Sequence, residues 1–305
     1  MKFLNRRISH FLCLLCFPAF LSAQWEAFPL GINEKLNIWD TEVVDANTVW
    51  AITTAGEYDA NLWAITPSAT FLRTADGGAN WTIGQLPLPD GSWGGWKVSA
   101  IDDNTAWVAA SNPFDLGAAI YKTTDGGTSW KQQSVFSSIS FCTVVHFWDA
   151  HDGIAIGDPL NGRYEIYRTN DGGATWSLVD AQQIPAPLFA WEYVTTSACS
   201  VIDDHIWFGT YGSRVFHSPD RGQTWTASTT PIALITSNPW VEGLTFRDSL
   251  HGIAYSANYN NVPYQHLIAY TEDGGQTWVQ QPIQNSDFAL FKAQYIKDTN
   301  LLFKT

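Results

Sequence analysis

Short apolar segments separated by polar turns recur along almost the whole chain. The clearest segments are four or five residues long, which suits strands better than helices. Each of them follows an acidic turn, and they cover residues 49–52, 106–110, 153–157, 206–209 and 252–256. The pattern therefore predicts an all-β protein.

A ten-residue pattern that ends in Trp occurs five times. In every copy a Ser or Thr lies two residues before an Asp, a Gly two residues after it and the Trp five residues after it. The copies occupy residues 72–81, 121–130, 167–176, 216–225 and 269–278. Their aspartates are 49, 46, 49 and 53 residues apart, and they are Asp76, Asp125, Asp171, Asp220 and Asp273. This period fits a four-stranded repeating unit.

The chemistry of the repeated pattern suits a tight turn between two strands. The Asp side chain accepts hydrogen bonds from backbone N–H groups of its own turn, and Gly supplies the positive φ that other residues avoid. The Trp closes the turn by packing against the strand. Each repeat then consists of a strand, an acidic turn, a strand, a loop, a strand, the Asp turn and a last strand, which predicts a β-propeller of four-stranded antiparallel blades.

This arrangement resembles the Asp-box (BNR) propellers, a superfamily that includes sialidases, xyloglucan hydrolases, sortilin-type receptors and photosystem II assembly-factor-like proteins. The acidic turn, the apolar strand and the Asp turn, in that order, are most similar to the assembly-factor-like branch of bacterial secreted proteins. The resemblance implies that the five aspartates are structural and lie on the rim opposite the binding face.

The two ends of the chain bear on the number of blades. Residues 24–28 look like a strand that follows an Asp-turn Trp, and residues 291–304 look like two strands around a turn at 297–300, with no sixth Asp turn after them. Because propellers close by completing the last blade with a strand from the start of the chain, we expect six blades, with seven as the alternative. The last blade is then incomplete in this chain, which suggests a piece of a longer reading frame.

Residues 1–23 have the pattern of an export signal. Lys2, Arg6 and Arg7 precede a mostly apolar stretch over residues 8–20, and the sequence Leu-Ser-Ala ends at Ala23. The apolar stretch is shorter than the ~20 residues that span a bilayer. We therefore expect cleavage after Ala23, a propeller domain over residues 24–305, no membrane insertion after cleavage, and a secreted, surface or periplasmic monomer.

Charge and cysteine content narrow the possible partners. Without residues 1–23, 13 Lys and Arg remain against 29 Asp and Glu, a net charge of −16. Nucleic acid is a poor partner for so acidic a protein. Cys142 and Cys199 remain, and either one disulfide or two buried thiols is compatible with an exported protein.

The loops opposite the Asp turns are rich in aromatic residues and carboxylates. Flat rings stack on the C–H face of a sugar and carboxylates accept its hydroxyl protons, while Tyr and Trp also anchor protein interfaces. Loop aromatics also pack between blades in propellers, so burial is the competing interpretation. The predicted ligand-binding residues are Trp93, Trp96, Tyr164, Trp191, Tyr193, Tyr211 and Trp240.

The alternative to a ligand-binding protein is an enzyme. The sequence lacks the arginine cluster of the sialidases, and glycoside hydrolysis needs two carboxylates roughly 5 to 10 Å apart. Glu192 paired with Glu242 or Asp158 is the candidate set. No zinc-ligand spacing, phosphate loop or calcium loop is present in the sequence, so no metal or other cofactor is expected.

These observations favour a non-catalytic propeller that recognises a glycan or protein ligand outside the cytoplasm. A sialidase-like or xyloglucanase-like glycoside hydrolase is the first alternative. A protein assembly or maturation factor is the second, and the acidity of the chain predicts that its partner carries a basic patch.

Overall fold

In the computed structural model, residues 33–305 form the unit that holds every strand of the described part of the chain. The described residues are 36–59, 64–66, 70–89, 93–112, 117–133, 136, 141–234, 240–258, 264–281, 284–286, 293–295 and 302–304. The predicted export signal, the predicted strand at 24–28 and the predicted turn at 297–300 lie outside them. Among the described residues, no helix is long and apolar enough to cross a lipid bilayer.

Antiparallel sheets make up nearly all of this unit. Sheet 1 contains β1 (Leu36–Val43), β2 (Val49–Asp59), β3 (Ala64–Thr66), β4 (Thr70–Thr74) and β5 (Thr82–Gln85). Sheet 2 contains β6 (Gly94–Ala100), β7 (Ala106–Asn112), β8 (Gly117–Thr123) and β9 (Lys131–Gln133). Sheet 3 contains β10 (Cys142–Phe147), β11 (Gly153–Leu160), β12 (Arg163–Thr169) and β13 (Ser177–Leu178).

The remaining strands form two further sheets and a strand pair. Sheet 4 contains β14 (Val194–Ile202), β15 (His205–Thr210), β16 (Arg214–Ser218) and β17 (Thr226–Thr229). Sheet 5 contains β18 (Gly243–Phe246), β19 (Gly252–Asn258), β20 (Tyr264–Thr271), β21 (Val279–Gln280) and β22 (Gln284–Ser286). The strand pair is β23 (Ala293–Tyr295) with β24 (Leu302–Lys304), and two short 3₁₀ helices, η1 (Ala181–Gln183) and η2 (Pro231–Leu234), lie in loops.

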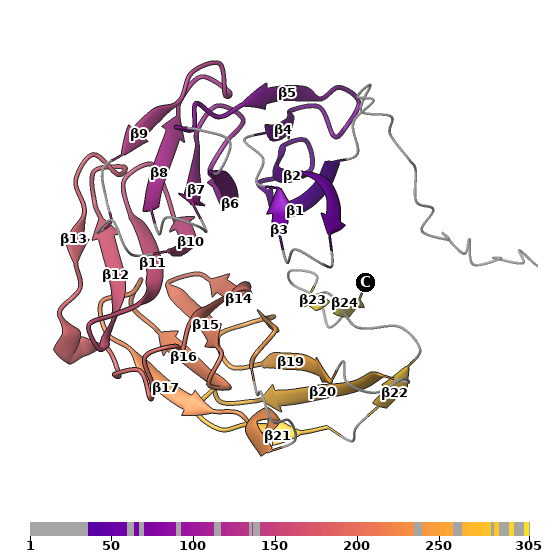
Figure 1. Cartoon of the computed structure of the whole chain (residues 1–305), viewed down its shortest axis with the longest axis vertical. Coiled ribbons are helices and arrows are strands. Elements are labelled where there is room, and N and C mark those ends of the chain that lie inside the picture. The colour runs from indigo at the N-terminus through magenta and orange to yellow at the C-terminus, as the bar shows by residue number, and fades with distance from the viewer. Residues whose placement is uncertain are drawn as a thin grey trace, which may run out of the picture. The chain divides into compact units, whose positions relative to one another are not determined.

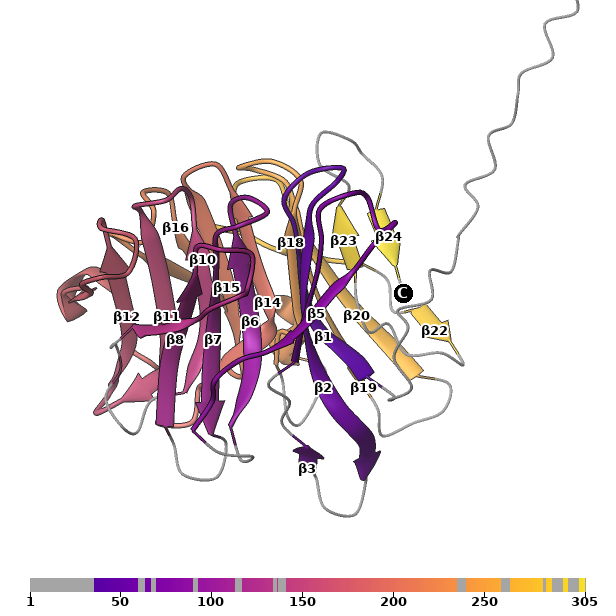
Figure 2. The same cartoon turned by 90° about the horizontal axis from the view of Figure 1, so that it is seen from above.

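The sheets follow one another around a common centre, and the first strand of each sheet is the innermost (Figure 1). The innermost strands contact their neighbours in the order β1, β6, β10, β14, β18 and β23. Seen from the side, the strands run between two rims (Figure 2). The unit is thus an all-β propeller of four-stranded antiparallel blades, and the fold predicted from the repeats is confirmed.

Hydrophobic cores lie between neighbouring sheets. One core joins Trp50 and Phe71 of sheet 1 to Val98 and Val108 of sheet 2, and equivalent clusters join sheets 2 and 3, 3 and 4, and 4 and 5. The second strand of each sheet is covered on both faces, and all seven residues of β7 are buried. This double burial explains why the segments after the acidic turns are continuously apolar.

The repeated Asp turn joins two antiparallel neighbours in each of these five sheets, namely β4 and β5, β8 and β9, β12 and β13, β16 and β17, and β20 and β21. In sheet 1, Asp76 Oδ1 accepts hydrogen bonds from the Thr74 hydroxyl at 2.9 Å and the Asn80 N–H at 2.8 Å. The Gly78 N–H donates to the Thr74 hydroxyl oxygen at 2.9 Å, and the Trp81 indole N–H donates to the Gly78 carbonyl at 3.1 Å. The other four turns repeat the Ser/Thr and Asp hydrogen bonds.

Indole groups of the second strands connect each of three sheets to a turn of the following sheet. Trp50 donates to the Asp102 carbonyl at 3.0 Å, in the acidic turn of sheet 2. Trp107 donates to the carbonyl of Gly172 at 3.1 Å and Trp207 to that of Gly274 at 2.8 Å, both in Asp turns. The turns therefore align neighbouring blades as well as closing their own hairpins.

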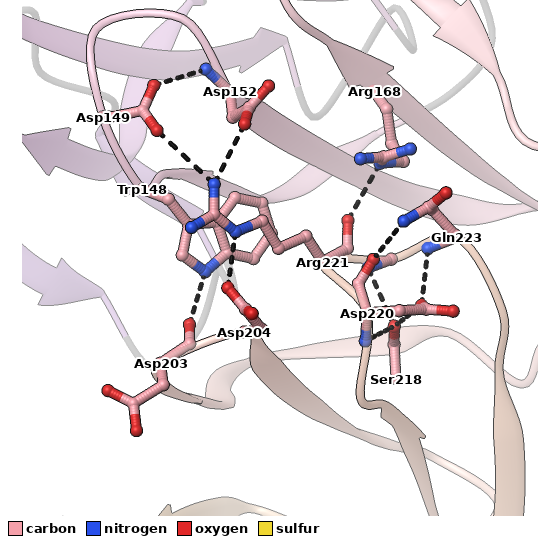
Figure 3. A network of polar contacts seen from close by, with 11 residues as sticks. Trp148, Asp149, Asp152, Arg168, Asp203, Asp204, Ser218, Asp220, Arg221 and Gln223 are labelled. Carbon is pink, nitrogen blue, oxygen red and sulfur yellow. Dashed lines mark hydrogen bonds and ion pairs between the residues drawn. The ribbon is translucent and has the colours of Figure 1, made fainter.

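The fourth Asp turn makes a further connection through Arg221 (Figure 3). This residue occupies the position of the first Gly of the other turns, with φ of 54°. Its guanidinium contacts Asp204 at 2.7 Å and Asp152 at 2.9 Å, and lies over the Trp148 ring at 5.5 Å from its centroid. Arg221 thus links sheets 3 and 4 by ion pairs from a left-handed backbone that is unfavourable for a non-glycine residue.

Cys142 and Cys199 are both free thiols. Cys142 is fully buried, and burial raises its pKa far above the ordinary range. Burial also raises the pKa of Cys199, to about 11. Of the two alternatives left open by the sequence, the structure has the free thiols and not the disulfide.

Candidate functional site

The two rims of the propeller carry different kinds of residue. The Asp turns and the acidic turns lie at one rim. Each acidic turn leads from the innermost strand to the next one, and each Asp turn leads to the outermost strand of the same antiparallel path, so both kinds of turn follow strands that run in the same direction. Consecutive antiparallel strands reverse direction, so the loops between second and third strands, and those between sheets, lie at the other rim, which we call the loop rim. The sequence-predicted ligand residues belong to segments of the loop rim.

The innermost strands of the first three sheets are irregular near the loop rim. Their pairing with the second strand shifts around Trp39 in β1, Trp96 in β6 and Thr143 in β10. Such bulges redirect side chains and are common at the ends of barrels and near binding sites. The Trp39 and Trp96 rings meet edge to face with centroids 5.3 Å apart, and Trp96 also contacts Phe141 at 5.6 Å.

Three of the predicted ligand residues are used in packing. Trp96 is buried and its indole donates to the Ser111 carbonyl at 3.1 Å. Tyr164 is buried and its hydroxyl donates to the Glu192 carbonyl at 2.8 Å. Trp93 is partly buried and lies so close to Gly117 that a Cβ there would be 2.8 Å from its ring. The structure therefore places these rings within or between sheets, as the competing interpretation of the loop aromatics expects.

Tyr193, Tyr211 and Trp240 are brought together and form what we call the aromatic corner. Tyr193 precedes β14, Tyr211 lies in the turn between β15 and β16, and Trp240 precedes β18. The Tyr193 and Tyr211 ring centroids are 6.1 Å apart with planes at 82°, and those of Tyr211 and Trp240 are 5.1 Å apart with planes at 89°. Tyr193 remains 44% exposed, so the corner is accessible to solvent.

Two of the three candidate carboxylates lie beside this corner. Burial and the negative charges of Asp158 and Glu242 raise the pKa of the Tyr211 phenol. Burial also raises the pKa of Asp158 to about 7, against the lowering effect of the Val194 N–H, which donates to its Oδ1 at 2.9 Å. Val194 belongs to the next sheet, so Asp158 lies where sheets 3 and 4 meet.

Glu192, the third candidate carboxylate, is completely buried and fully hydrogen bonded. Its Oε1 accepts from the Thr210 hydroxyl at 2.9 Å and from Arg214 Nε at 2.7 Å. Its Oε2 accepts from the Leu188 N–H at 2.7 Å and from Arg214 Nη2 at 2.6 Å. Gly212 leaves room for this pair, since a Cβ there would be 2.6 Å from Oε1. Glu192 therefore anchors its loop to β16 and is sealed from solvent.

The anchored loop presents an apolar surface next to the aromatic corner. Trp191 is 54% exposed and Leu188 is 65% exposed, and the Phe189 ring lies against Trp191 with centroids 4.0 Å apart and planes tilted by 38°. Exposed large apolar side chains in a contiguous group mark interaction sites. Trp191 and Tyr193 thus lie at the surface, and Glu192 between them holds the loop in place.

The centre of the propeller carries a second group of charged residues. Lys97 Nζ lies 2.8 Å from Asp40 Oδ1, and the Val98 N–H donates to Asp40 Oδ2 at 3.0 Å. Burial, followed by the charge of Asp40, raises the pKa of Glu42 to about 7 despite the nearby Lys97. Among the described residues, no group of three or more His, Cys, Asp or Glu side chains is arranged to hold a metal ion.

Trp39 and Phe141 were not among the residues predicted from the sequence. Each lies close to the beginning of an innermost strand, the position that Trp93, Tyr193 and Trp240 have in other sheets. An aromatic residue shortly before or within the first strand of each repeat was therefore the available signal.

No protein-family model matches the chain. No curated protein matches it. Solved structures do resemble it: YCF48 bound to D1 peptide has a TM-score of 0.52 at 16% identity, over 87% of this chain and 89% of that one. YCF48 from Cyanidioschyzon merolae has a TM-score of 0.52 at 19% identity, over 90% of this chain and 94% of that one.

Enzymes with larger chains share the fold as well. An ancestral GH74 enzyme has a TM-score of 0.58 at 15% identity, and the match covers 83% of this chain but only 32% of the enzyme. At such identities the likeness concerns the fold alone. The chain is a β-propeller whose architecture is shared by the YCF48 and GH74 propellers.

Proposed function

We propose that this protein is an exported, non-catalytic β-propeller of the Asp-box type that recognises a glycan or protein ligand through the loop rim of sheets 3, 4 and 5. The observation that carries the proposal is the accessible aromatic corner beside Asp158 and Glu242, next to the exposed Trp191. Rings and carboxylates in one accessible place are the groups that ligand sites use.

Several features support the Asp-box type, the export and the ligand class in this proposal. The hydrogen bonding of the five Asp turns matches the structural role that the Asp-box resemblance implies for Asp76, Asp125, Asp171, Asp220 and Asp273. The pattern of residues 1–23 supports export to the surface, the medium or the periplasm. The YCF48 structure bound to D1 peptide supports a protein ligand for a propeller of this fold, and the GH74 structure supports a glycan.

Burial of Glu192 favours binding over hydrolysis. A general acid or nucleophile must reach the glycosidic bond, and a carboxylate with no exposed surface and four hydrogen bonds does not reach it. Of the candidate hydrolase residues, only Asp158 and Glu242 then remain near the corner. One experiment, described next, tests both ligand binding and glycoside hydrolysis.

The test uses the chain from Gln24 onward with panels of polysaccharides, glycans and peptides. We expect binding without release of reducing ends, and loss of binding in Trp191→Ala and Trp240→Ala. Leu250→Ala, an exposed apolar residue at the Asp-turn rim, is the matched control and retains binding. Release of reducing ends that is abolished by Asp158→Asn or Glu242→Gln would replace the proposal with a glycoside hydrolase.

A further inference from the structure

Two histidine side chains contact each other at the Asp-turn rim of sheet 4. His205 is the first residue of β15, His217 lies near the end of β16, and both residues are half-buried. The His205 Nδ1 and His217 Nε2 atoms are 2.9 Å apart. A ring nitrogen of a histidine carries either a hydrogen or a lone pair, so this contact is a hydrogen bond when exactly one of the two nitrogens carries a hydrogen.

The two imidazole rings lie over Trp207, which in turn lies on Phe246 of sheet 5. The His217 and Trp207 ring centroids are 4.6 Å apart with planes at 5°, and those of Trp207 and Phe246 are 3.9 Å apart with planes at 9°. The planes of the two imidazoles differ by 10°. The Trp207 indole also donates to the Gly274 carbonyl at 2.8 Å. The histidine pair therefore covers a side chain through which sheet 4 contacts sheet 5 and its Asp turn.

The number of protons on the pair decides whether the contact between the imidazoles is favourable. Two neutral rings form the hydrogen bond, because one ring donates and the other accepts. A first added proton preserves it, since a charged ring still donates to a neutral one. A second added proton leaves a hydrogen on both facing nitrogens and brings two positive rings together, which repel each other. The pair therefore accepts one proton but resists a second.

The surroundings of His217 also oppose its charged form. Burial, followed by the charge of His205, lowers the pKa of His217 to about 4, against the raising effect of Asp220. Asp204, which precedes His205 in the chain, is paired with Arg221 at 2.7 Å. The carboxylate of the nearby Asp turn therefore does not offset the burial of His217 and the charge of its neighbour.

The other elements packed around the pair contact it with uncharged groups. Thr226 of β17 pairs with His217 in the sheet, and Phe246 of sheet 5 belongs to the stack of rings. In the Asp turn of sheet 5, the Asp273 carboxylate is hydrogen bonded within its own turn, and Glu272 is exposed. Within the part of the chain that the structure describes, no carboxylate is thus hydrogen bonded to either imidazole.

We propose that the His205–His217 pair is an acid-sensitive switch at the junction of sheets 4 and 5. The pair holds Trp207 in place while it carries at most one proton, and it releases Trp207 from the Asp turn of sheet 5 when both imidazoles are protonated. This switch lies at the Asp-turn rim and is independent of ligand binding at the loop rim, so either proposal can fail without the other.

The test compares the free energy of unfolding in urea at pH 8 and at pH 5, with the chain from Gln24 onward. His205→Phe and His217→Phe each keep a flat ring on Trp207 and leave one imidazole. His151→Gln, which removes an exposed imidazole from the acidic turn of sheet 3, is the control. The unfolded chain protonates His217 near its ordinary pKa of 6.5 and the folded chain only near 4, so the stability contributed by the neutral ring is present above pH 6.5 and falls as the pH falls to 4.

We expect the unfolding equilibrium constant to rise between pH 8 and pH 5 by about thirtyfold more in the unchanged chain than in His217→Phe, which corresponds to about 2 kcal/mol. His205→Phe reduces the rise by about threefold or more, because His217 then no longer faces a second positive ring. His151→Gln leaves the rise unchanged. An equal rise in the unchanged chain and in His205→Phe would show that His217 acts alone and would overturn the pair as a switch.

Hydrogen–deuterium exchange of the unchanged chain locates the effect without a substitution. With exchange rates corrected for the intrinsic effect of pH, we expect residues 271–276 of sheet 5 to lose protection at pH 4 relative to pH 8, and residues 169–174 of sheet 3 to keep theirs. Equal loss in both Asp turns would indicate a general effect of acid, and unchanged protection of residues 271–276 would show that Trp207 is not released. Either result would overturn the inference.

Discussion

Removal of the Glu192 carboxylate is expected to destabilise the protein severely. Glu192 has no exposed surface, and its partner Arg214 is only 9% exposed at the side chain. Glu192→Ala leaves the guanidinium buried without its counter-ion and leaves the Leu188 N–H without an acceptor. The Thr210 hydroxyl keeps only its longer hydrogen bond to the Arg214 carbonyl, at 3.3 Å. Breaking a buried ion pair from one side costs about 3–5 kcal/mol.

That loss is a large part of the free energy of unfolding of a typical domain, about 5–15 kcal/mol. Urea unfolding followed by Trp fluorescence measures it as a lower midpoint at an unchanged slope. Glu272→Gln, an exposed substitution at the other rim, is the control and changes stability by less than about 0.5 kcal/mol.

A double variant separates the ion pair from the packing. Replacing Glu192 and Arg214 together by Met removes both charges from the interior, and such replacements are often neutral or stabilising. We expect the double variant to recover most of the stability lost in Glu192→Ala. A loss below about 1 kcal/mol in Glu192→Ala would refute the structural role of this carboxylate, because the buried pair would then contribute no more than an exposed one.

Three further predictions follow from the turns and the raised pKa values. Thr169→Val removes the hydroxyl that accepts the Gly173 N–H and costs about 1–3 kcal/mol, whereas Thr229→Val on the surface is neutral in the same urea assay. Arg221→Gly is more stable than Arg221→Ala by about 1 kcal/mol, since both lose the ion pairs but only Gly suits the positive φ; equal stability would contradict the strain. In the folded chain Asp158 keeps its proton up to about pH 7, whereas in the unfolded chain it loses it near its ordinary pKa of 3.8, so its contribution to stability falls as pH rises from 4 to 7. The free energy of unfolding is therefore measured at pH 5 and at pH 8. We expect its drop between these two pH values to be smaller in Asp158→Asn than in the unchanged chain, by on the order of 2 kcal/mol, and an identical drop in both would exclude Asp158 as the cause.

The Asp turns could be predicted from the sequence because the hydrogen bonds of their Ser or Thr and Asp side chains to the turn backbone lie within ten residues. Thr74, Asp76, Gly78 and Asn80 contact one another locally, so the same letters give the same turn wherever they occur. Their regular spacing then predicts the blades. The exception is visible in the sequence, because Arg221 replaces the first Gly of the other turns. Its ion-pair partners Asp149 and Asp152 are not, because they lie about 70 residues away in the sequence.

The candidate site was only partly predictable, because it depends on contacts between sheets. Trp96 and Trp191 are both Trp residues of loop-rim segments, yet Trp96 is buried and Trp191 is 54% exposed. Trp96 lies at the bulge in β6, whereas Trp191 lies in the loop that Glu192 anchors. Nothing local marks Glu192 as the partner of Arg214, which is 22 residues away. Burial between sheets therefore separated the predicted ligand residues into two groups.

The most direct test of the central claim locates the bound ligand on the propeller. Hydrogen–deuterium exchange of the chain is measured with and without the tightest ligand from the binding panels. The account predicts slower exchange in segments 188–194, 210–213 and 240–242, with no change in the Asp turns at 171–176 and 218–225. Protection confined to the Asp turns would contradict the assignment of binding to the loop rim.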